Sequence, residues 1–238
     1  MLERTGLGEV FESAITPSLM YLPSLTEEAD SLKLLSAAYP ALIELARARF
    51  PGDEHRQSRV KALDRIMRYG ILKGYTHAGE HAKIAEMLVR QVTVLVDEMG
   101  IDVVKFLKVC EHGYFCSSHT ADVLPKNVLP LLAANLADPF ATAYPPLLQA
   151  SVKSIRAIIV TAWPRVAYHR GDILQGLTIC WCRIEEQETE SEELRIIKED
   201  VKDTVRLLTV VLEMDVNVAE DYRQLIDSDN RLQGLLAI

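Results

Sequence analysis

Residues 129–159, LPLLAANLADPFATAYPPLLQASVKSIRAII, decide the fold that we expect for this chain. An apolar helix with a proline near its middle is followed by an Asp138-Pro139 turn, and a second helix then packs back with small and branched residues inward. This is the pattern of a HEAT repeat. The next apolar start, Ile173, comes 44 residues after Leu129, counting from 129 to 173. That spacing lies within the roughly 40–47-residue period of HEAT and armadillo repeats.

Helices are predicted for nearly the whole chain. Apolar residues recur at spacings of three and four, as in Ile84, Leu88, Val92 and Leu95, and each such set forms one apolar stripe on a helix. No comparable stretch alternates with period two, so we predict no strand. The predicted helices span 26–49, 55–72, 79–99, 102–109, 123–137, 146–163, 172–185, 190–213 and 217–228.

The loops between most of these helices are short, so neighbouring helices should pack antiparallel. We therefore predict an all-α fold, an α-solenoid of about four HEAT-like helical hairpins, since at least three repeats are needed to bury a continuous core. Residues 1–23 are interpreted as an N-terminal lead-in and 24–238 as a single helical-repeat domain. The segment 109–122 has no helical period, and we interpret it as a loop inserted into that domain.

Composition excludes several classes of protein. The chain has 238 residues, of which 49% are apolar and 25% charged, so it is not intrinsically disordered as a whole. Its net charge of −8 argues against a general binder of nucleic acid or of anionic membranes. No apolar run approaches the roughly 20 residues that span a bilayer, and the first residues do not resemble a signal peptide. Four cysteines are too few for a disulfide scaffold, so we expect a cytoplasmic or nuclear protein.

One short motif could indicate metal-dependent hydrolysis. His77, Glu80 and His81 match H-x-x-E-H, the inverted zinc-protease pattern, in which two histidines on one continuous helix bind zinc and the carboxylate acts as base. Gly79 lies inside the motif, immediately before an apolar stripe begins. The alternative interpretation is a helix N-terminus, with His77 in the turn and Glu80 in the first helical turn, where a carboxylate suits the helix dipole.

Cysteines form two further clusters. The loop segment offers four possible zinc ligands at an unusual spacing, and the competing interpretation is a solvated loop with incidental cysteines. These weak candidates are Cys110, His112, Cys116 and His119. Cys180 and Cys182 form C-x-C rather than the redox C-x-x-C, and buried structural cysteine is the better interpretation. With no phosphate-binding loop, nucleotide-binding glycine pattern or nucleophile elbow, we predict no catalytic residue and no cofactor.

Charge is distributed unevenly along the chain. Residues 47–73 carry eight basic and three acidic side chains, whereas residues 185–203 carry nine acidic and three basic ones. These segments could be two partner-binding surfaces or two solvated helix faces. Arg56, Arg59 and Arg65 are therefore candidate partner-binding residues. The basic segment has few aromatic residues, so single-stranded nucleic acid is not favoured as its ligand.

Several stretches resemble the fungal branch of the Tti-two family, the second Tel-two-interacting protein. They cover most of the chain, and their order and spacing carry the resemblance, although the chain is shorter than expected for the family. The stretches are YLPSL at 21–25, LLSAAYPAL at 34–42, GILKGYTHAGEH at 70–81, DPFATAYPPL at 138–147, WPR at 163–165 and HRG at 169–171.

The resemblance implies a non-enzymatic helical subunit of the TTT co-chaperone complex, with Tel-two and Tti-one as direct partners. This complex acts with the Hsp90 machinery to mature phosphatidylinositol-kinase-related kinases. Phe140, Tyr144 and Trp163 near repeat turns, with Arg165, are candidate anchors for a partner, because aromatic and arginine side chains dominate binding hot spots. They could equally fill gaps between repeats. The alternative functions are a zinc-dependent hydrolase and a HEAT-repeat adaptor for unrelated cargo.

Overall fold

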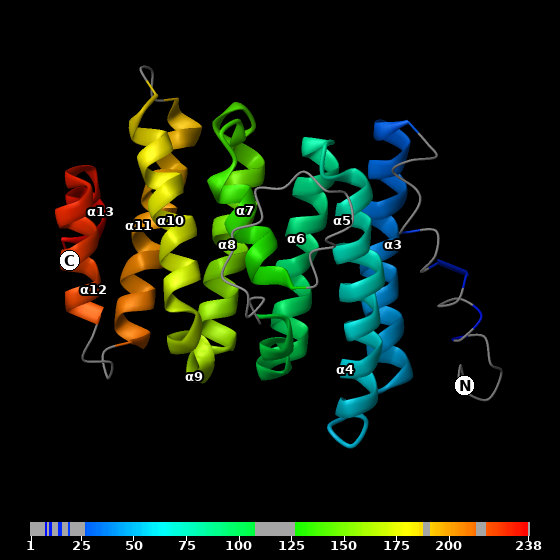
Figure 1. Ribbon diagram of the computed structural model, residues 1–238. Helices are drawn as coiled ribbons and strands as arrows, with labels where there is room; N and C mark the ends of the chain where they lie inside the picture. The colour runs from blue at the N-terminus through cyan, green and yellow to red at the C-terminus, as the bar shows by residue number, and fades with distance from the viewer. Residues whose placement is uncertain are drawn as a thin grey trace. The chain divides into compact units, whose positions relative to one another are not determined.

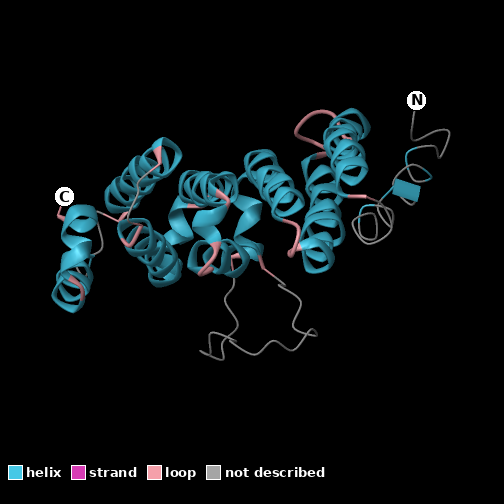
Figure 2. Cartoon of the chain, turned by 90° about the horizontal axis from the view of Figure 1, so that it is seen from above, coloured by secondary structure: helices cyan, strands magenta, loops and turns pink. Residues whose placement is uncertain are grey.

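The computed structural model describes residues 8, 10, 14–15, 19, 27–107, 127–187, 191–212 and 218–237. The regular structure in this part of the chain is helical, and Figure 2 shows no strand in it. This confirms the all-α prediction. None of the helices in the described residues combines the length and apolarity that a membrane crossing requires.

The helices group into two compact units, which are described separately. The first comprises residues 1–102 and 110–128, and the second residues 103–109 and 129–238. The predicted single domain over 24–238 and its solenoid of about four hairpins stay predictions. The proposed insert at 109–122 lies outside the described residues.

Within residues 27–102, the first unit consists of three helical runs (Figure 1). The first run is α3 (Glu28–Arg49), and the third is α6 (Ala82–Met99), followed by the start of the 3-10 helix η2 (Gly100–Phe106). Between them the chain runs through α4 (Arg56–Arg65), the π-helix η1 (Ile66–Leu72) and α5 (Lys73–Ala78) without leaving helical geometry. α3 packs against both α4 and α6. The predicted helix over 55–72 therefore continues six residues further, to Ala78.

Apolar burial holds this unit together. The predicted stripe of α6 is buried along its length, from Ile84 to Met99. Exposed ion pairs join α3 to α6 near both ends: Glu28 lies 3.2 Å from Lys83, and Arg47 donates to Glu98 at 3.1 Å. Surface pairs of this kind contribute about 0–1 kcal/mol, whereas each fully buried aliphatic side chain contributes about 1.5–3 kcal/mol.

The second unit consists of two consecutive helical hairpins and a C-terminal segment (Figure 1). α7 (Val128–Ala137) and α8 (Pro145–Thr161) form the first hairpin, joined through the short 3-10 helix η3 (Ala141–Ala143). α10 (Arg170–Glu185) and α11 (Glu192–Val211) form the second. The C-terminal segment comprises α12 (Val218–Ser228), η5 (Asn230–Leu232) and α13 (Gln233–Leu236), of which 229–236 were not predicted as helical.

The two hairpins stack on one another. α8 packs closely along α11, and α10 approaches α7 at Gly176, where a Cβ atom would lie 3.3 Å from the Cα of Ala133. Asn135 of α7 donates to the Ser151 hydroxyl of α8 at 3.3 Å, inside the core. One sequence prediction needs correction: Pro130 is the third residue of α7, not a mid-helix proline. Proline is tolerated there because the first amides of a helix have no intrahelical acceptor.

A π-helix in the first unit accommodates a buried tyrosine. Gly70 lies within η1, and a Cβ atom at this position would be 3.1 Å from Cε1 and 3.2 Å from the hydroxyl oxygen of Tyr39. The Tyr39 side chain is fully buried, and its hydroxyl has no hydrogen-bond partner among the described residues. Burial raises the pKa of Tyr39 well above its ordinary value, so the side chain stays neutral. Glycine is therefore needed at position 70 for steric reasons.

Replacing Tyr39 with Phe should raise the urea midpoint of unfolding. The variant keeps the ring packing and removes a buried hydroxyl whose lost hydration costs about 1–3 kcal/mol. Gly70→Ala should lower the midpoint, because the added methyl group meets the Tyr39 ring. Circular dichroism during urea titration measures both variants. A lower midpoint for Tyr39→Phe would mean that the hydroxyl has a stabilising partner.

Candidate protein-binding surface

The H-x-x-E-H motif does not lie on one helix. His77 is in the last turn of α5, Gly79 and Glu80 form a turn, and His81 is the N-cap residue of α6. The expectation that Glu80 lies in the first helical turn was wrong, since the helix begins at Ala82 rather than at residue 79. All three motif side chains are exposed, and His81 lies 3.6 Å from Glu28 of α3. Two histidines on one continuous helix, which this zinc site requires, are not present here.

No group of three or more His, Cys, Asp or Glu side chains in the described ranges is arranged to hold a metal ion. The other zinc prediction remains a prediction, because its residues lie outside the described part of the chain. These are Cys110, His112, Cys116 and His119.

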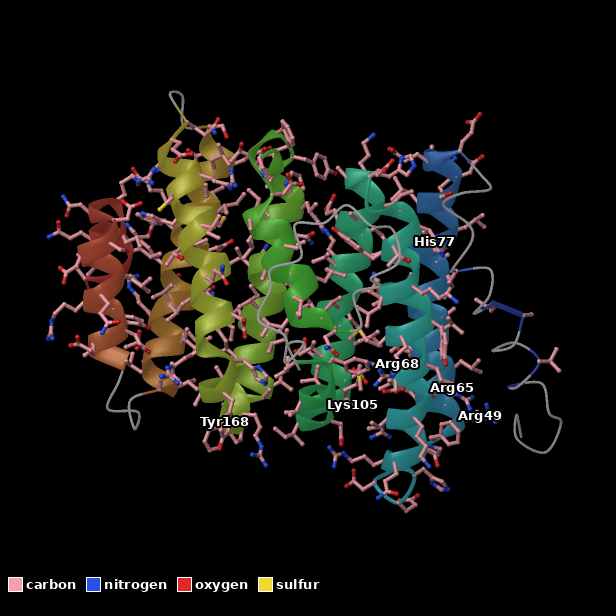
Figure 3. All side chains as sticks on the ribbon, viewed as in Figure 1. Arg49, Arg65, Arg68, His77, Lys105 and Tyr168 are labelled. Atoms are coloured by element: carbon pink, nitrogen blue, oxygen red, sulfur yellow. The ribbon has the colours of Figure 1, made fainter. Side chains whose placement is uncertain are left out.

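The predicted basic surface of the first unit is largely engaged in contacts within that unit. Arg56 donates to Asp102 at 2.8 Å. Arg59 donates to the carbonyl oxygens of Phe50 and Gly52 at 3.0 and 3.2 Å, and so fastens the turn between α3 and α4. Arg65 is exposed on α4, where Figure 3 shows it on the same side as Arg68 and Arg49.

The predicted aromatic anchors lie at two separate places. Phe140, 80% exposed, lies in the turn before α8, where its amide donates to Asp138 at 2.9 Å. Tyr144 is the half-buried N-cap residue of α8. Trp163 and Arg165 follow the other end of this helix, whose 17 residues span about 25 Å. A single binding surface would have to extend along α8 to include all four.

The chain turns sharply after α8. The Ala162 amide donates to Ile158 at 2.8 Å, and the Arg165 amide donates to Ala162 at 2.8 Å, which starts the short helix α9 (Trp163–Val166). Pro164 suits the start of a helix because it lacks an amide hydrogen. The 3-10 helix η4 (Ala167–His169) then leads into α10.

This turn places large side chains in solvent. Trp163 is 62% exposed and Tyr168 77% exposed, while Ala162 and Val166 fill the interior. Figure 3 shows Tyr168 pointing outward beside α9. Trp163 therefore does not fill a gap in the packing of this unit. We call Val160, Trp163, Arg165 and Tyr168 the α8–α9 corner.

Tyr168 was missed in the sequence analysis. Helical periodicity does not distinguish it, because it lies in a short connection between helices. The distribution of acidic residues would have drawn attention to it: the 33 residues from Pro139 to Gly171 contain no Asp or Glu, although the chain has 34.

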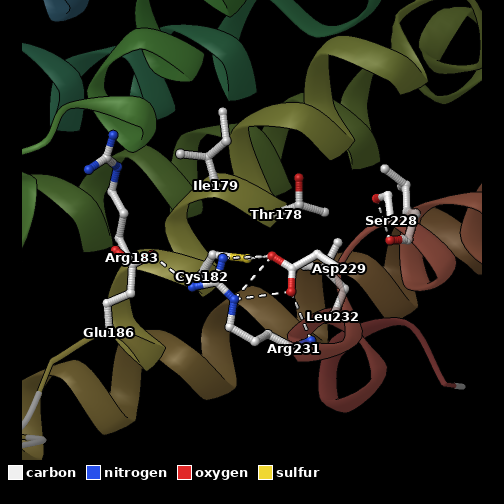
Figure 4. Close-up of a pocket in the computed structure, with 10 residues that line it drawn as sticks. Thr178, Ile179, Cys182, Arg183, Glu186, Ser228, Asp229, Arg231 and Leu232 are labelled. Carbon is white, nitrogen blue, oxygen red and sulfur yellow. Dashed lines mark hydrogen bonds and ion pairs between the residues drawn. The ribbon is translucent and has the colours of Figure 1, made fainter.

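A concave site lies in the C-terminal part of the second unit. An open depression of about 390 Å³ separates α10 from α12 and η5 (Figure 4). Its polar lining consists mainly of Cys182, Arg183, Glu186, Asp229 and Arg231.

The thiol in this depression is not a nucleophile at neutral pH. Cys182 Sγ lies 3.6 Å from Asp229 Oδ2, and burial together with this carboxylate raises the pKa of Cys182 to about 11. Burial likewise raises the pKa of Cys180 to about 12. Reactive cysteines have lowered pKa values, so both are structural thiols here. The structural interpretation of the C-x-C pair is therefore supported.

Alkylation of Cys182 by iodoacetamide should keep accelerating up to about pH 11, roughly tenfold per pH unit, because only the thiolate reacts. A raised pKa in the folded state also means that this thiol stabilises the fold below about pH 9 and loses that contribution as the pH approaches 11. Mass spectrometry of the modified peptide follows the rate, with Cys182→Ser assigning the signal. A rate that levels off near pH 9 would contradict the shift.

The charged side chains of the depression hold the C-terminal segment in place. Arg231 donates to Asp229 and to Glu186, each at 2.7 Å, and Asp229 also accepts the Arg231 amide at 3.0 Å (Figure 4). Hydrogen bonding from Arg231 lowers the pKa of Asp229 to about 2. Trp181, buried in α10, donates from Nε1 to the Arg231 carbonyl oxygen at 3.0 Å. These contacts indicate that the side chains lining the depression attach the C-terminal segment to α10.

Asp229→Ala should speed amide hydrogen exchange in residues 230–236, because it removes both the cap of η5 and the partner of Arg231. Asp229→Asn, which keeps a capping oxygen, should have a smaller effect. Because the pKa of Asp229 is lowered, its charge contributes fully above about pH 4 and is lost as the pH falls towards 2. Equal exchange in both variants at pH 7 would assign no role to the cap.

Comparison with known proteins yields one family match, which covers part of the chain. The model of the Tti2 family matches residues 1–110, which lie almost entirely in the first unit. This confirms the resemblance drawn from the sequence over these residues, while the stretches at 138–171 lie outside the match. No curated protein and no solved structure matches the chain.

Proposed function

Because residues 1–110 match the model of the Tti2 family, we propose that this chain is a non-catalytic subunit of the TTT co-chaperone complex that binds homologues of Tel-two and Tti-one. The family match is the observation that carries this proposal. In this role the chain supports the maturation and stability of phosphatidylinositol-kinase-related kinases together with the Hsp90 machinery. We place it in the cytoplasm or nucleus, where these kinases are made and act.

The structure is compatible with a scaffold. Stacked helical hairpins present one face of each helix to the core and leave the other available to partners, as in helical-repeat proteins. In the second unit, α8 and α11 bury their apolar stripes against each other, and the exposed faces carry charged side chains. The H-x-x-E-H motif is divided between α5, a turn and the N-cap of α6, so it offers no support for the hydrolase alternative.

Co-expression with the Tel-two and Tti-one homologues tests the proposal. The full chain should co-purify with both at comparable amounts in about 150 mM salt, because a constitutive subunit buries a large interface, roughly 2,000 Å² or more. Depletion of the chain from its own cells should lower the protein levels of the kinases without lowering their messenger RNA.

A variant with His77→Ala, Glu80→Gln and His81→Ala serves as the control for the hydrolase alternative. It should restore kinase levels as well as the natural chain does. Failure of both partners to co-purify with a folded chain would overturn the proposed function, and loss of rescue by this variant would favour a role for the motif.

A further inference from the structure

We propose that the outward face of α8 and the α8–α9 corner together bind an acidic protein segment that carries an apolar side chain. The inference rests on the proposed function only in that a co-chaperone subunit binds protein partners. The surface itself is defined by exposure and charge within the second unit. It comprises Lys153, Arg156, Val160, Trp163, Arg165 and Tyr168, all of them exposed.

The charge of this surface is not balanced by acidic side chains in the part of the chain that the structure describes. Lys153, Arg156 and Arg165 form no ion pair with any acidic side chain in the described residues. The absence of Asp and Glu between Pro139 and Gly171 explains why, since no i+3 or i+4 partner is available along this stretch. A cluster of unpaired cations in a chain of net charge −8 favours a negatively charged partner.

Other exposed arginines of the same unit are paired. Arg195 lies 2.5 Å from Glu192, Arg206 lies 3.0 Å from Asp203, and Arg223 lies 2.5 Å from Glu220. Near the corner, Arg170 is also paired, at 2.9 Å from Asp221. Glu192, Glu199 and Asp203 of α11 therefore already have basic partners on their own helix, and Asp200 accepts from Gln149 of α8 at 3.4 Å. They are not the missing counterions of the α8 surface.

Apolar side chains lie next to the cations. Lys153, Arg156 and Val160 are spaced i, i+3 and i+7, so they lie on one face of α8, and Trp163 follows three residues after Val160. Trp163 and Tyr168 are both largely exposed. Exposed Trp, Tyr and Arg side chains that lie together are the residues most enriched in binding hot spots. The apolar part of the partner segment would cover these rings while its carboxylates reach the cations.

A protein segment fits better than nucleic acid or a membrane. Three unpaired cations are fewer than the roughly 6–10 phosphate contacts of typical DNA-binding proteins, and the net charge of the chain is negative. A carboxylate-rich segment needs only a few such contacts, because apolar burial supplies the remaining affinity.

The two tryptophans of the chain make binding directly measurable. Trp163 is exposed, whereas Trp181 is only 2% exposed, so changes in fluorescence on binding at this surface should come from Trp163. The probe is a synthetic peptide of about twelve residues, made of Glu and Asp with Leu or Phe at every third or fourth position. Its addition to the full chain should shift the Trp163 emission to shorter wavelength and protect it from acrylamide. The shift should be lost in Trp163→Phe, and binding should weaken as salt rises from 50 to 300 mM.

Charge reversal at the surface provides the decisive comparison. The triple variant Lys153→Glu, Arg156→Glu, Arg165→Glu should bind the peptide at least about tenfold more weakly. The control variant Arg195→Glu, Arg206→Glu, Arg223→Glu has the same net charge and should bind within about twofold of the natural chain. Circular dichroism confirms that both variants are folded.

Three outcomes would overturn the inference: equal weakening in the two triple variants, equal binding of a peptide with Lys in place of the acidic residues, or tighter binding of an oligouridylate. The peptide assay uses the purified chain alone, so it does not depend on the Tel-two and Tti-one homologues. A complex that forms while the peptide fails to bind would reject this surface and leave the proposed function standing. Peptide binding without complex formation would support this surface and overturn the proposed function.

Discussion

The packing of α8 along α11 is the contact on which the second unit depends. The two helices belong to successive hairpins, and each buries one apolar stripe, which includes Val152 and Ile155 on α8 and Ile197 and Val201 on α11. Burial of such side chains contributes about 1.5–3 kcal/mol each, well above the roughly 0–1 kcal/mol of an exposed ion pair. α10 and α13 also pack against α11, so the second hairpin and the C-terminal segment share this helix.

The same contact decides which side chains of α8 reach solvent. The apolar residues of α8 bury one side of the helix, and Lys153, Arg156 and Val160 lie together on its exposed side. Core and surface are thus two consequences of one periodic pattern.

Helix existence was predictable, and several helix boundaries were not. The stripes of α6 and α11 predicted these helices well, because regular apolar spacing reflects burial directly. The break before α6 was predicted at 73–78 and lies at 79–81, and the π-helix at Ile66–Leu72 was missed. Gly70 leaves room for the side chain of Tyr39, which lies 31 residues earlier in the chain. No local sequence pattern indicates that contact. The H-x-x-E-H motif failed as a zinc site for the same reason, since its chemistry requires a continuous helix.

The sequence by itself determined the all-helical class, the positions of the main apolar stripes and the similarity of residues 1–110 to the Tti2 family. These follow from local periodicity and from residue order, both of which are visible along the sequence without knowledge of the fold. Only the tertiary structure decided that Arg56 and Arg59 serve contacts within the first unit, that Phe140 and Trp163 lie at opposite ends of α8, and that Tyr168 joins Trp163 at the α8–α9 corner. The physical reason is that exposure and pairing depend on which residues distant in sequence cover a side chain.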